Sequence, residues 1–319
     1  MKKILVLGGC GYVGSVLVPA FLRAGYLVHV LDTLWFGNHL ASNANLKVLG
    51  LDIREIDKWK PIENYDCIVH LANIANDPGV ELCPELSWEV NVLATKYVAD
   101  FATRNKIDQI IYASSGSVYG LKDEENVTED LALVPLSTYN KTKMIAERIL
   151  LSYSDVLKSH IIRPATVCGL SPRMRLDVSV NALTYQGVAN GLITVFGGDQ
   201  IRPNIHIHDL ASVFIHFVEN PYLDTGAYNA GFQNLSIMQI AEMVAEVVDT
   251  KITRIADSND PRSYRVDSSK LLSTGFAPSL DVGTAINEIV EAYRSGDLRE
   301  SASCYTVQMM KKMGLAGGN

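Results

Sequence analysis

Three glycines at regular intervals follow the first apolar run of the chain, and they restrict its possible folds more than any other feature. The run Lys3 to Leu7 is rich in aliphatic residues, which predicts a buried strand. Gly8, Gly11 and Gly14 come directly after it, and a helix is expected from Ser15 to Arg23. Such glycines allow a tight turn and a close approach of the backbone to a pyrophosphate at the positive end of the helix. The pattern predicts a dinucleotide site.

An acidic residue ends the next expected strand. The apolar run Leu27 to Leu31 is followed by Asp32, at the place where a carboxylate accepts hydrogen bonds from ribose hydroxyls. A carboxylate there would repel a 2′-phosphate, and no arginine follows nearby to receive one. The sequence therefore favours NAD over NADP.

Tyr139 and Lys143 lie one turn apart on an expected helix over residues 139–152. An ammonium beside a phenol favours the phenolate, so we expect the pKa of Tyr139 to fall toward neutrality. Tyr139 would then serve as an acid/base for a hydroxyl proton. Tyr-x-x-x-Lys also occurs by chance, as a half-buried tyrosine beside a surface lysine. Together with the glycine pattern, it indicates a hydride-transfer site.

The composition limits the class of protein and its partners. With 319 residues, 48% hydrophobic and 20% charged, the chain can bury a large core as one big domain or two lobes. Its net charge of −7, without a basic stripe, argues against a nucleic-acid partner. No apolar stretch is long enough to span a membrane, and the glycines interrupt the first apolar run too early for a secretory signal.

The cysteines and histidines show no metal-binding pattern. The five cysteines are scattered, which predicts reduced thiols in a cytoplasmic protein. Cys168 falls near the expected active site, but a packing role is favoured. The seven histidines include no HExxH motif, and His206 and His208 merely alternate on a strand-like stretch. No metal is expected.

Expected strands alternate with expected helices through the first half of the chain. This alternation predicts an α/β fold, a Rossmann-type doubly wound parallel sheet with a smaller C-terminal substrate-binding lobe. The expected strands are 3–7, 27–31, 46–50, 67–71, 109–113 and 159–163, and the helices lie near 13–23, 86–104 and 139–152.

The pattern becomes less regular after Pro164. A returning strand is expected over 204–207, followed by helices over 209–219, 236–249 and 281–296, while the tail 301–319 is expected to fray. We therefore predict an NAD-binding domain from 1–168 plus a returning segment over about 203–230. The segments 169–202 and 231–319 would form the substrate lobe.

In this order the motifs resemble the extended short-chain dehydrogenase/reductase family, and more narrowly its NAD-dependent nucleotide-sugar epimerases and dehydratases. The likeness covers nearly the whole chain. Besides the motifs above, the matching stretches are His70-Leu71-Ala72-Asn73, Asn91, Ser114-Ser115-Gly116-Ser117-Val118-Tyr119-Gly120, Arg163-Pro164 and Arg202.

The resemblance implies roles for individual residues. Tyr139 would be the base, Lys143 would bind the nicotinamide ribose and tune Tyr139, and Ser115 would hold the sugar hydroxyl. Asp52 would contact adenine or be a turn residue, and Asn91 would be a polar residue of the sheet–helix packing. The implied cofactor-binding residues are Gly8, Gly11, Tyr12, Val13, Gly14, Asp32, Asp52, Ile53, Leu71, Ala72, Asn73, Asn91 and Lys143.

The resemblance also implies a sugar nucleotide bound in the second lobe. A guanidinium offers phosphate a planar fork of donors, although any one arginine can equally be a solvated surface charge. Arg202 and Arg262 would clamp the diphosphate, and Asn181 would contact it. The full set of implied substrate contacts is Ser115, Ser117, Tyr139, Arg173, Arg175, Asn181, Arg202 and Arg262.

The reaction is narrowed by the pair Gly116-Ser117. Sugar 4,6-dehydratases of this family carry a glutamate at the second position, and a serine cannot supply a carboxylate. This departure favours oxidation or reduction at a ring hydroxyl, preferably C4, with epimerisation. A dehydrogenase or reductase without epimerisation is the alternative, and a dehydratase or a non-catalytic NAD-binding regulator stays open. The family likeness implies a homodimer, paired through the helices near 86–104 and 139–152.

Overall fold

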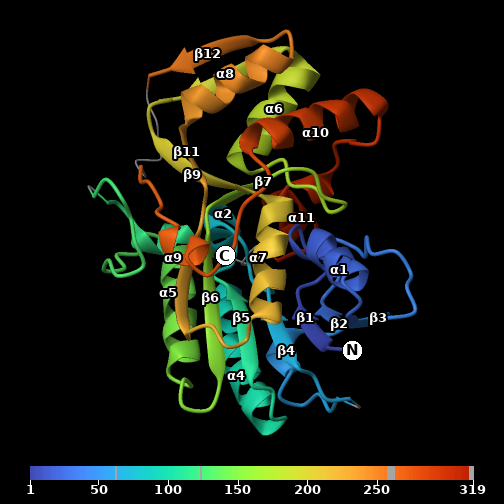
Figure 1. Ribbon diagram of the computed structural model, residues 1–319. Helices are drawn as coiled ribbons and strands as arrows, with labels where there is room; N and C mark the ends of the chain where they lie inside the picture. Colours follow the sequence, from blue (N-terminus) through green and yellow to red (C-terminus); the bar gives the residue numbers. More distant parts are fainter. Residues whose placement is uncertain (62, 123, 257–262, 316–319) are drawn as a thin grey trace.

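The computed structural model describes residues 1–61, 63–122, 124–256 and 263–315. A large sheet with helices on both faces forms the first lobe, and a smaller helical lobe sits over one end of it (Figure 1). Within the described residues the main sheet has the strand order β10-β6-β5-β4-β1-β2-β3, and all neighbours are parallel. Its strands are β1 (Lys3–Leu7), β2 (Leu27–Asp32), β3 (Leu46–Gly50), β4 (Cys67–His70), β5 (Gln109–Ala113), β6 (Lys158–Pro164) and β10 (Gly226–Ala230). The predicted Rossmann-type fold is confirmed.

Strand β1 shows why the central strands are apolar throughout. Ile4 and Val6 face one layer of helices, while Leu5 and Leu7 face the other. A parallel sheet that is covered on both faces needs apolar side chains on both faces. Its strands therefore do not alternate between apolar and polar residues. The first strand can therefore be recognised from the sequence, although its two faces cannot be told apart.

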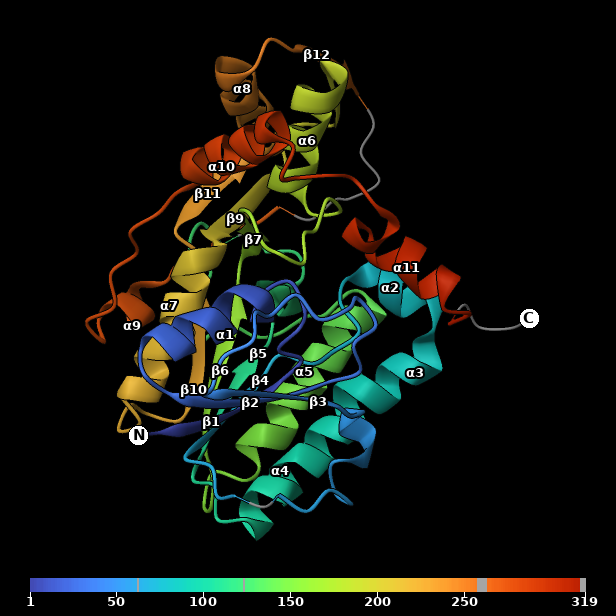
Figure 2. The same ribbon diagram turned by 90° about the vertical axis from the view of Figure 1, so that its right-hand side faces the viewer.

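Two helical layers cover the sheet (Figure 2). Helices α1 (Gly14–Arg23) and α7 (Ile207–Glu219) pack on one face, and α4 (Ala94–Arg104) and α5 (Thr138–Leu151) pack on the other. The helix predicted near 86–104 is divided into α3 (Pro84–Trp88), a π-helical turn (Glu89–Leu93) and α4. Helix α2 (Asp77–Leu82) and the short turns Ile53–Glu55 and Gly116–Tyr119 complete this lobe.

The second lobe has its own apolar cluster. Helices α6 (Ser179–Asn190), α8 (Ile237–Val247) and α10 (Val282–Ser295) surround it, beside the paired strands β8 (Leu192–Phe196) and β12 (Lys251–Ile255). A three-stranded sheet with the order β11-β9-β7 joins this lobe to the first. Its members are β7 (Thr166–Cys168), β9 (Ile201–His206) and β11 (Gln233–Ser236), and α9 (Ser269–Leu272) follows later beside β10.

The returning strand is not where the sequence placed it. Residues 204–207 were expected to rejoin the main sheet, but β9 runs over Ile201–His206 and pairs with β7 and β11. The chain rejoins the main sheet through β10, beside β6. The sequence of β10, Gly-Ala-Tyr-Asn-Ala, contains no β-branched residue, so propensity gives little signal for it.

The C-terminal tail does not fray over its described part, and it does not belong to the second lobe alone. Helix α11 (Thr306–Lys312) packs beside α2 on the first lobe (Figure 2). Met310 is 1% exposed within the same apolar cluster as Val80 and Cys83. The expectation of fraying was therefore wrong for residues 301–315, and residues 316–319 lie outside the described ranges.

The cysteines in the described ranges are buried and unpaired. No group of three His, Cys, Asp or Glu side chains that could hold a metal ion occurs among the described residues. No described helix is long and apolar enough to cross a membrane.

A buried ion pair fixes helix α5 to the sheet. Arg163 on β6 donates from Nε and Nη2 to the two carboxylate oxygens of Glu147, at 3.0 and 2.7 Å. Both side chains are almost fully buried, and Ser114 also donates to this carboxylate. Arg163 further donates to the hydroxyl of Tyr119, which donates to Asn229 on β10.

We expect Glu147→Gln to destabilise the protein by about 3–5 kcal/mol, because it leaves the Arg163 charge buried without a counter-charge. The free energy of unfolding in urea measures this change. Glu242→Gln, at an exposed position of α8, is the matched control and should stay within about 0.5 kcal/mol of the parent protein. Equal stabilities of the two variants would show that the pair does not hold α5 in place.

Candidate active site

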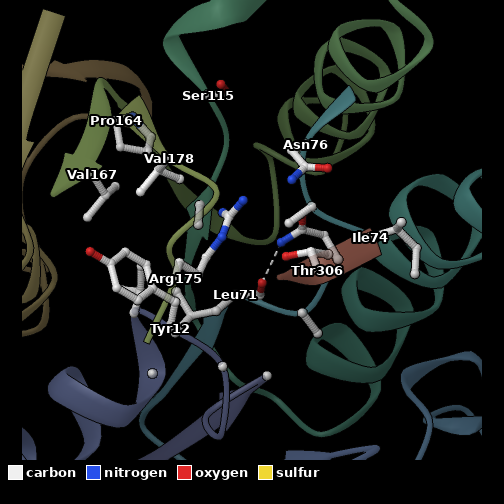
Figure 3. Close-up of a pocket in the computed structure, with 18 of the residues that line it drawn as sticks. Tyr12, Leu71, Ile74, Asn76, Ser115, Pro164, Val167, Arg175, Val178 and Thr306 are labelled. Atoms are coloured by element: carbon white, nitrogen blue, oxygen red, sulfur yellow. Dashed lines mark hydrogen bonds between the residues drawn. The ribbon is translucent and has the colours of Figure 1, made fainter. Parts of the chain in front are cut away.

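A cavity of about 540 Å³ lies between the two lobes, at the carboxyl ends of the central strands. Its size is typical of a small-molecule site, and this edge of an open parallel sheet is where ligands bind. Gly8 after β1, Asp32 at the end of β2, Leu71 after β4 and Ser114 after β5 all line it. Figure 3 shows it enclosed by residues from both lobes.

The glycine turn forms the floor of the cavity. Gly8 has a φ of +80°, and a Cβ on it would lie 2.6 Å from the backbone nitrogen of Ala72. A Cβ on Gly14 would lie 2.5 Å from the carbonyl oxygen of Gly9, so neither position accepts a larger residue. A Cβ on Gly11 would meet only the oxygen of Gly8, at 3.4 Å. The turn is therefore closed toward the protein and open toward the cavity at Gly11, which fits the close approach of a pyrophosphate.

Asp32 is held in place by backbone amides. Its carboxylate oxygens accept hydrogen bonds from the amides of Cys10 at 2.9 Å and Leu34 at 2.8 Å. Burial raises the pKa of Asp32, while these hydrogen bonds oppose the shift. Asp52 and Ile53 line the same end of the cavity, and Asp52 pairs with Arg54 at 2.8 Å.

A chain of hydroxyl groups starts at Tyr139. The Ser115 side chain lies beside the phenol and lowers its pKa against the effect of burial, and Ser115 Oγ lies 2.8 Å from Oγ of Ser117. Ser117 in turn donates to Oδ1 of Asn140 at 2.6 Å. Ser137 caps helix α5 by accepting from the amide of Asn140, so the helix begins with Tyr139 facing the cavity. The structure thus brings together the tyrosine and both serines that the sequence singled out.

Lys143 lies beside these groups but does not shift the pKa of Tyr139 in the expected way. Its ammonium donates to the carbonyl of Ala113 at 2.7 Å and lies 5.9 Å from the centre of the Tyr139 ring. Burial lowers the pKa of Lys143 to about 7. Burial raises the pKa of Tyr139 to about 12, and the nearby positive charge that opposes this shift is Arg175. The expectation that Lys143 lowers the pKa of Tyr139 toward neutrality is therefore wrong.

Two arginines reach the cavity from the segment between β7 and α6. The Arg173 guanidinium lies 3.8 Å from the ring centre of Phe36, and burial lowers its pKa to about 10. Arg175 donates from Nε to Asp177 at 2.7 Å and projects toward Ser115 (Figure 3). Nη2 of Arg175 is buried with no hydrogen-bond partner among the described residues. An unpaired buried guanidinium nitrogen suits an acceptor group on a ligand. Arg202 also lines the cavity.

Three of the predicted contact residues are not among the described cavity residues. Asn181 is 0% exposed and bonds to the amide of Gly169, the carbonyl of Arg175 and the hydroxyl of Tyr12. It therefore holds the arginine segment in place instead of facing the cavity. Asn91 accepts from the amide of Ile74 and donates to its carbonyl, which fixes the backbone behind the cavity wall. Arg262 lies outside the described residues.

Sequence reasoning missed several cavity residues that come from distant parts of the chain. Asn76 caps α2, Asp77 is its first residue, and Thr306 begins α11. The amide of Thr306 donates to Asp177 at 3.0 Å, so the C-terminal segment closes over the arginine segment. The run Asn76-Asp77-Pro78-Gly79 is a helix-start signal, but nothing local indicates that it meets residues 306–310.

The cavity residues fit a dinucleotide. One continuous surface of the cavity runs from the glycine turn to Tyr139. It includes the open turn at Gly11, the anchored Asp32, and the wall formed by Leu71, Ala72 and Asn73. The remaining predicted cofactor residues, Tyr12, Val13, Ile53 and Lys143, line it as well. The hydroxyl of Tyr12 donates to the carbonyl of Gly169 at 2.8 Å, so its side chain links the two lobes.

The chain is similar to known sugar-nucleotide enzymes in sequence and fold. It is 26% identical to the UDP-glucose 4-epimerase of Lactobacillus helveticus, over 84% of this chain and 89% of the relative. The Thermus thermophilus UDP-glucose 4-epimerase in complex with NAD superposes with a TM-score of 0.80, at 22% identity, over 92% of this chain and 99% of that one. TunA, an NAD-dependent NDP-hexosamine 5,6-dehydratase, superposes with a TM-score of 0.82, at 22% identity, over 94% and 99% of the two chains.

A family model also matches the chain directly. The model of the NAD dependent epimerase/dehydratase family covers residues 4–231, which include the glycine turn, the Ser115–Ser117 segment, Tyr139 and Lys143. The expected resemblance is confirmed, and with it the expectation of an enzyme that uses NAD. The chain belongs to the NAD-dependent epimerase/dehydratase family.

Proposed function

We propose that the protein oxidises a ring hydroxyl of a nucleotide-diphosphate sugar, at C4, and returns the hydride to give the epimer. The observation that carries this proposal is that Tyr139, Ser115 and Lys143 line one cavity that continues to the glycine turn. The relatives named UDP-glucose 4-epimerase support the choice of C4 and of a uridine diphosphate sugar. Release of the ketone would instead make the protein a dehydrogenase.

Each cavity residue has a defined task in this proposal. Bound NAD supplies the hydride acceptor and a positively charged nicotinamide ring. Ser115 holds the sugar oxygen, and Tyr139 removes its proton in the oxidation and returns it in the reduction. Lys143 would contact the nicotinamide ribose. Burial opposes ionisation of Tyr139, so the positive charges that face it must favour the phenolate during the reaction.

In this proposal the arginines bind different parts of the substrate and the cofactor. Arg175 lowers the pKa of Tyr139 through its charge and projects toward Ser115, so it lies at the sugar end of the cavity. Arg202 lies on β9, at the second lobe, and would bind the diphosphate together with Arg262. Arg173 lies over Phe36, and its charge opposes the rise that burial causes in the pKa of Asp32, so it would belong to the adenosine end of the cofactor site.

We expect Tyr139→Phe to reduce turnover about 10²- to 10⁴-fold and to leave NAD affinity within about twofold, because only the proton-transferring hydroxyl is removed. Interconversion of UDP-glucose and UDP-galactose, followed by chromatography, measures turnover, and titration calorimetry measures NAD binding. Tyr153→Phe, two residues beyond the C-terminal end of α5 and away from the cavity, is the control. Parental rates in Tyr139→Phe would reject the proposed base.

We expect Asp32→Asn to lower the ratio of the NADP dissociation constant to the NAD dissociation constant at least about tenfold. The reason is that a like charge against the 2′-phosphate of NADP costs several kcal/mol. Asparagine keeps an acceptor for one of the two amides that hold this side chain. Dissociation constants for both dinucleotides, measured by calorimetry, test the expectation. An unchanged ratio would show that Asp32 does not face the ribose 2′ position.

We further propose that two copies pair through α4 and α5, as the family likeness implies. Leu93, the last residue of the π-helical turn before α4, is 49% exposed, which leaves apolar surface for such a contact. Light scattering at micromolar concentration should give twice the chain mass of 35.0 kDa. A mass of one chain would refute the pairing, and Leu93→Glu should shift the mass toward that value.

A further inference from the structure

A carboxylate that the proposed reaction does not use lies in the same cavity as Tyr139. Asp77 lines the cavity at the start of α2 and is partly buried. Ser137, the N-cap of α5, donates its hydroxyl to Oδ1 of Asp77, and Tyr139 follows two residues later on that helix. The two side chains are near enough for the charge of Asp77 to raise the pKa of Tyr139. A second acid/base group therefore lies next to the proposed one.

The backbone just before Asp77 is strained. Asn76 has a φ of +65° and a ψ of 162°, a conformation that a residue with a Cβ rarely adopts. Its amide oxygen accepts from the amide of Gly79 at 2.8 Å, and its nitrogen donates to Asp177 at 3.4 Å. Such strain persists only where surrounding contacts enforce it, and it concentrates at active sites. These contacts hold the start of α2, and Asp77 with it, against the cavity.

A ketone in the sugar ring would give this carboxylate a reaction to perform. Oxidation of a ring hydroxyl makes the hydrogens on the adjacent carbons acidic, because the resulting carbanion is delocalised onto the ketone oxygen. That oxygen would lie at Tyr139 and Ser115, which hold the original hydroxyl in the proposed function. Arg175, whose buried Nη2 has no hydrogen-bond partner in the described part of the chain, faces the same region from the second lobe. Fixed donors of this kind stabilise an enolate.

We propose that Asp77 is a further catalytic residue, whose carboxylate removes a proton from the ring carbon adjacent to the ketone. The inference rests on the proposed function, because the ketone must first form. It adds carbon-acid chemistry to hydride transfer, so the hydrogen on the carbon adjacent to the ketone would exchange with solvent during turnover. The pair Gly116-Ser117 lacks the carboxylate that sugar dehydratases carry at the second of these positions. In this proposal the carboxylate is supplied by Asp77 of α2 instead.

The proposed step is balanced within the site. Asp77 takes the proton, the electrons of the C–H bond form a carbon–carbon double bond, and the carbonyl electron pair moves to oxygen. The enolate oxygen accepts hydrogen bonds from the Tyr139 hydroxyl, which was protonated in the preceding oxidation, and from Ser115. Return of a proton from the Asp77 carboxylic acid restores the ketone. Hydride and the Tyr139 proton then reduce it, so no external oxidant is required.

The test measures carbon-bound deuterium during turnover in D₂O. UDP-glucose, UDP-glucuronic acid and UDP-N-acetylglucosamine serve as probes, and the position of any deuterium is found by NMR. A reaction that only transfers hydride out and back introduces no solvent deuterium at carbon. Proton removal by Asp77 places deuterium on the carbon adjacent to the oxidised one, because a carboxylic acid exchanges its proton with solvent.

Three variants separate a catalytic role from a positioning role. Asp77→Asn keeps an acceptor for Ser137 but loses the base, so deuterium incorporation should fall at least about 100-fold while NAD reduction changes less than about tenfold. Glu81→Gln, at an exposed position on the same helix, should leave both unchanged. Ser137→Ala keeps the carboxylate without its hydrogen bond and should retain exchange at a reduced rate. Thermal unfolding and NAD affinity confirm that each variant is folded.

The outcomes distinguish this inference from the proposed function. Turnover by the parent protein without carbon-bound deuterium would overturn the role of Asp77 and leave the epimerase proposal standing. Exchange that persists in Asp77→Asn would overturn it too. Failure of all three sugars to reduce NAD or to turn over would overturn the proposed function, and this inference with it.

Discussion

The buried pair of Arg163 and Glu147 holds the active-site helix in its position. Its two hydrogen bonds join the middle of α5 to β6, and Ser114 adds a third contact from the end of β5. Burying two charges costs much of what their attraction returns, so the pair contributes specificity more than stability. A single orientation of α5 follows, because any rotation would leave a charge unpaired. That orientation determines where Tyr139 and Lys143 lie.

The same network reaches parts of the chain that the site also needs. Arg163 donates to Tyr119, Tyr119 donates to Asn229, and Asn229 donates to the carbonyls of Val127 and Asp267. The turn that carries Ser115 and Ser117 thus shares one buried set of hydrogen bonds with β10. Buried polar groups of this kind must all be satisfied together. The distance between Ser115 and Tyr139 is therefore set by contacts behind the cavity as well as within it.

Closure of the cavity depends on a second set of contacts between the lobes. Tyr12 in the glycine turn donates to Gly169, and Asn181 donates to Tyr12 and to the carbonyl of Arg175. The backbone amide of Thr306 donates a hydrogen bond to the carboxylate of Asp177. The cofactor turn, the arginine segment and the C-terminal segment are consequently one connected structure. All three segments contribute residues to the lining of the cavity.

The charges around Tyr139 show how far local sequence can mislead. Lys143 is adjacent on the helix, yet its ammonium is directed to the carbonyl of Ala113, and burial lowers its own pKa. The charges that act on the phenol come from Arg175 and Asp77, on other elements and in opposite senses. Helical spacing predicts which residues are neighbours. It does not predict the direction of a long side chain or the dielectric environment around it.

The parallel sheet could be predicted from the sequence alone. The same holds for the glycine turn with Asp32 and for the order of Ser115, Tyr139 and Lys143. These features depend on local patterns, namely apolar runs and residues at fixed spacing. Three features could not be predicted in this way: β10 and not β9 rejoins the main sheet, Asn181 lies behind the cavity, and Asp77 and Thr306 reach the cavity. These outcomes depend on contacts between residues far apart in the chain, and such contacts have no local spacing to reveal them.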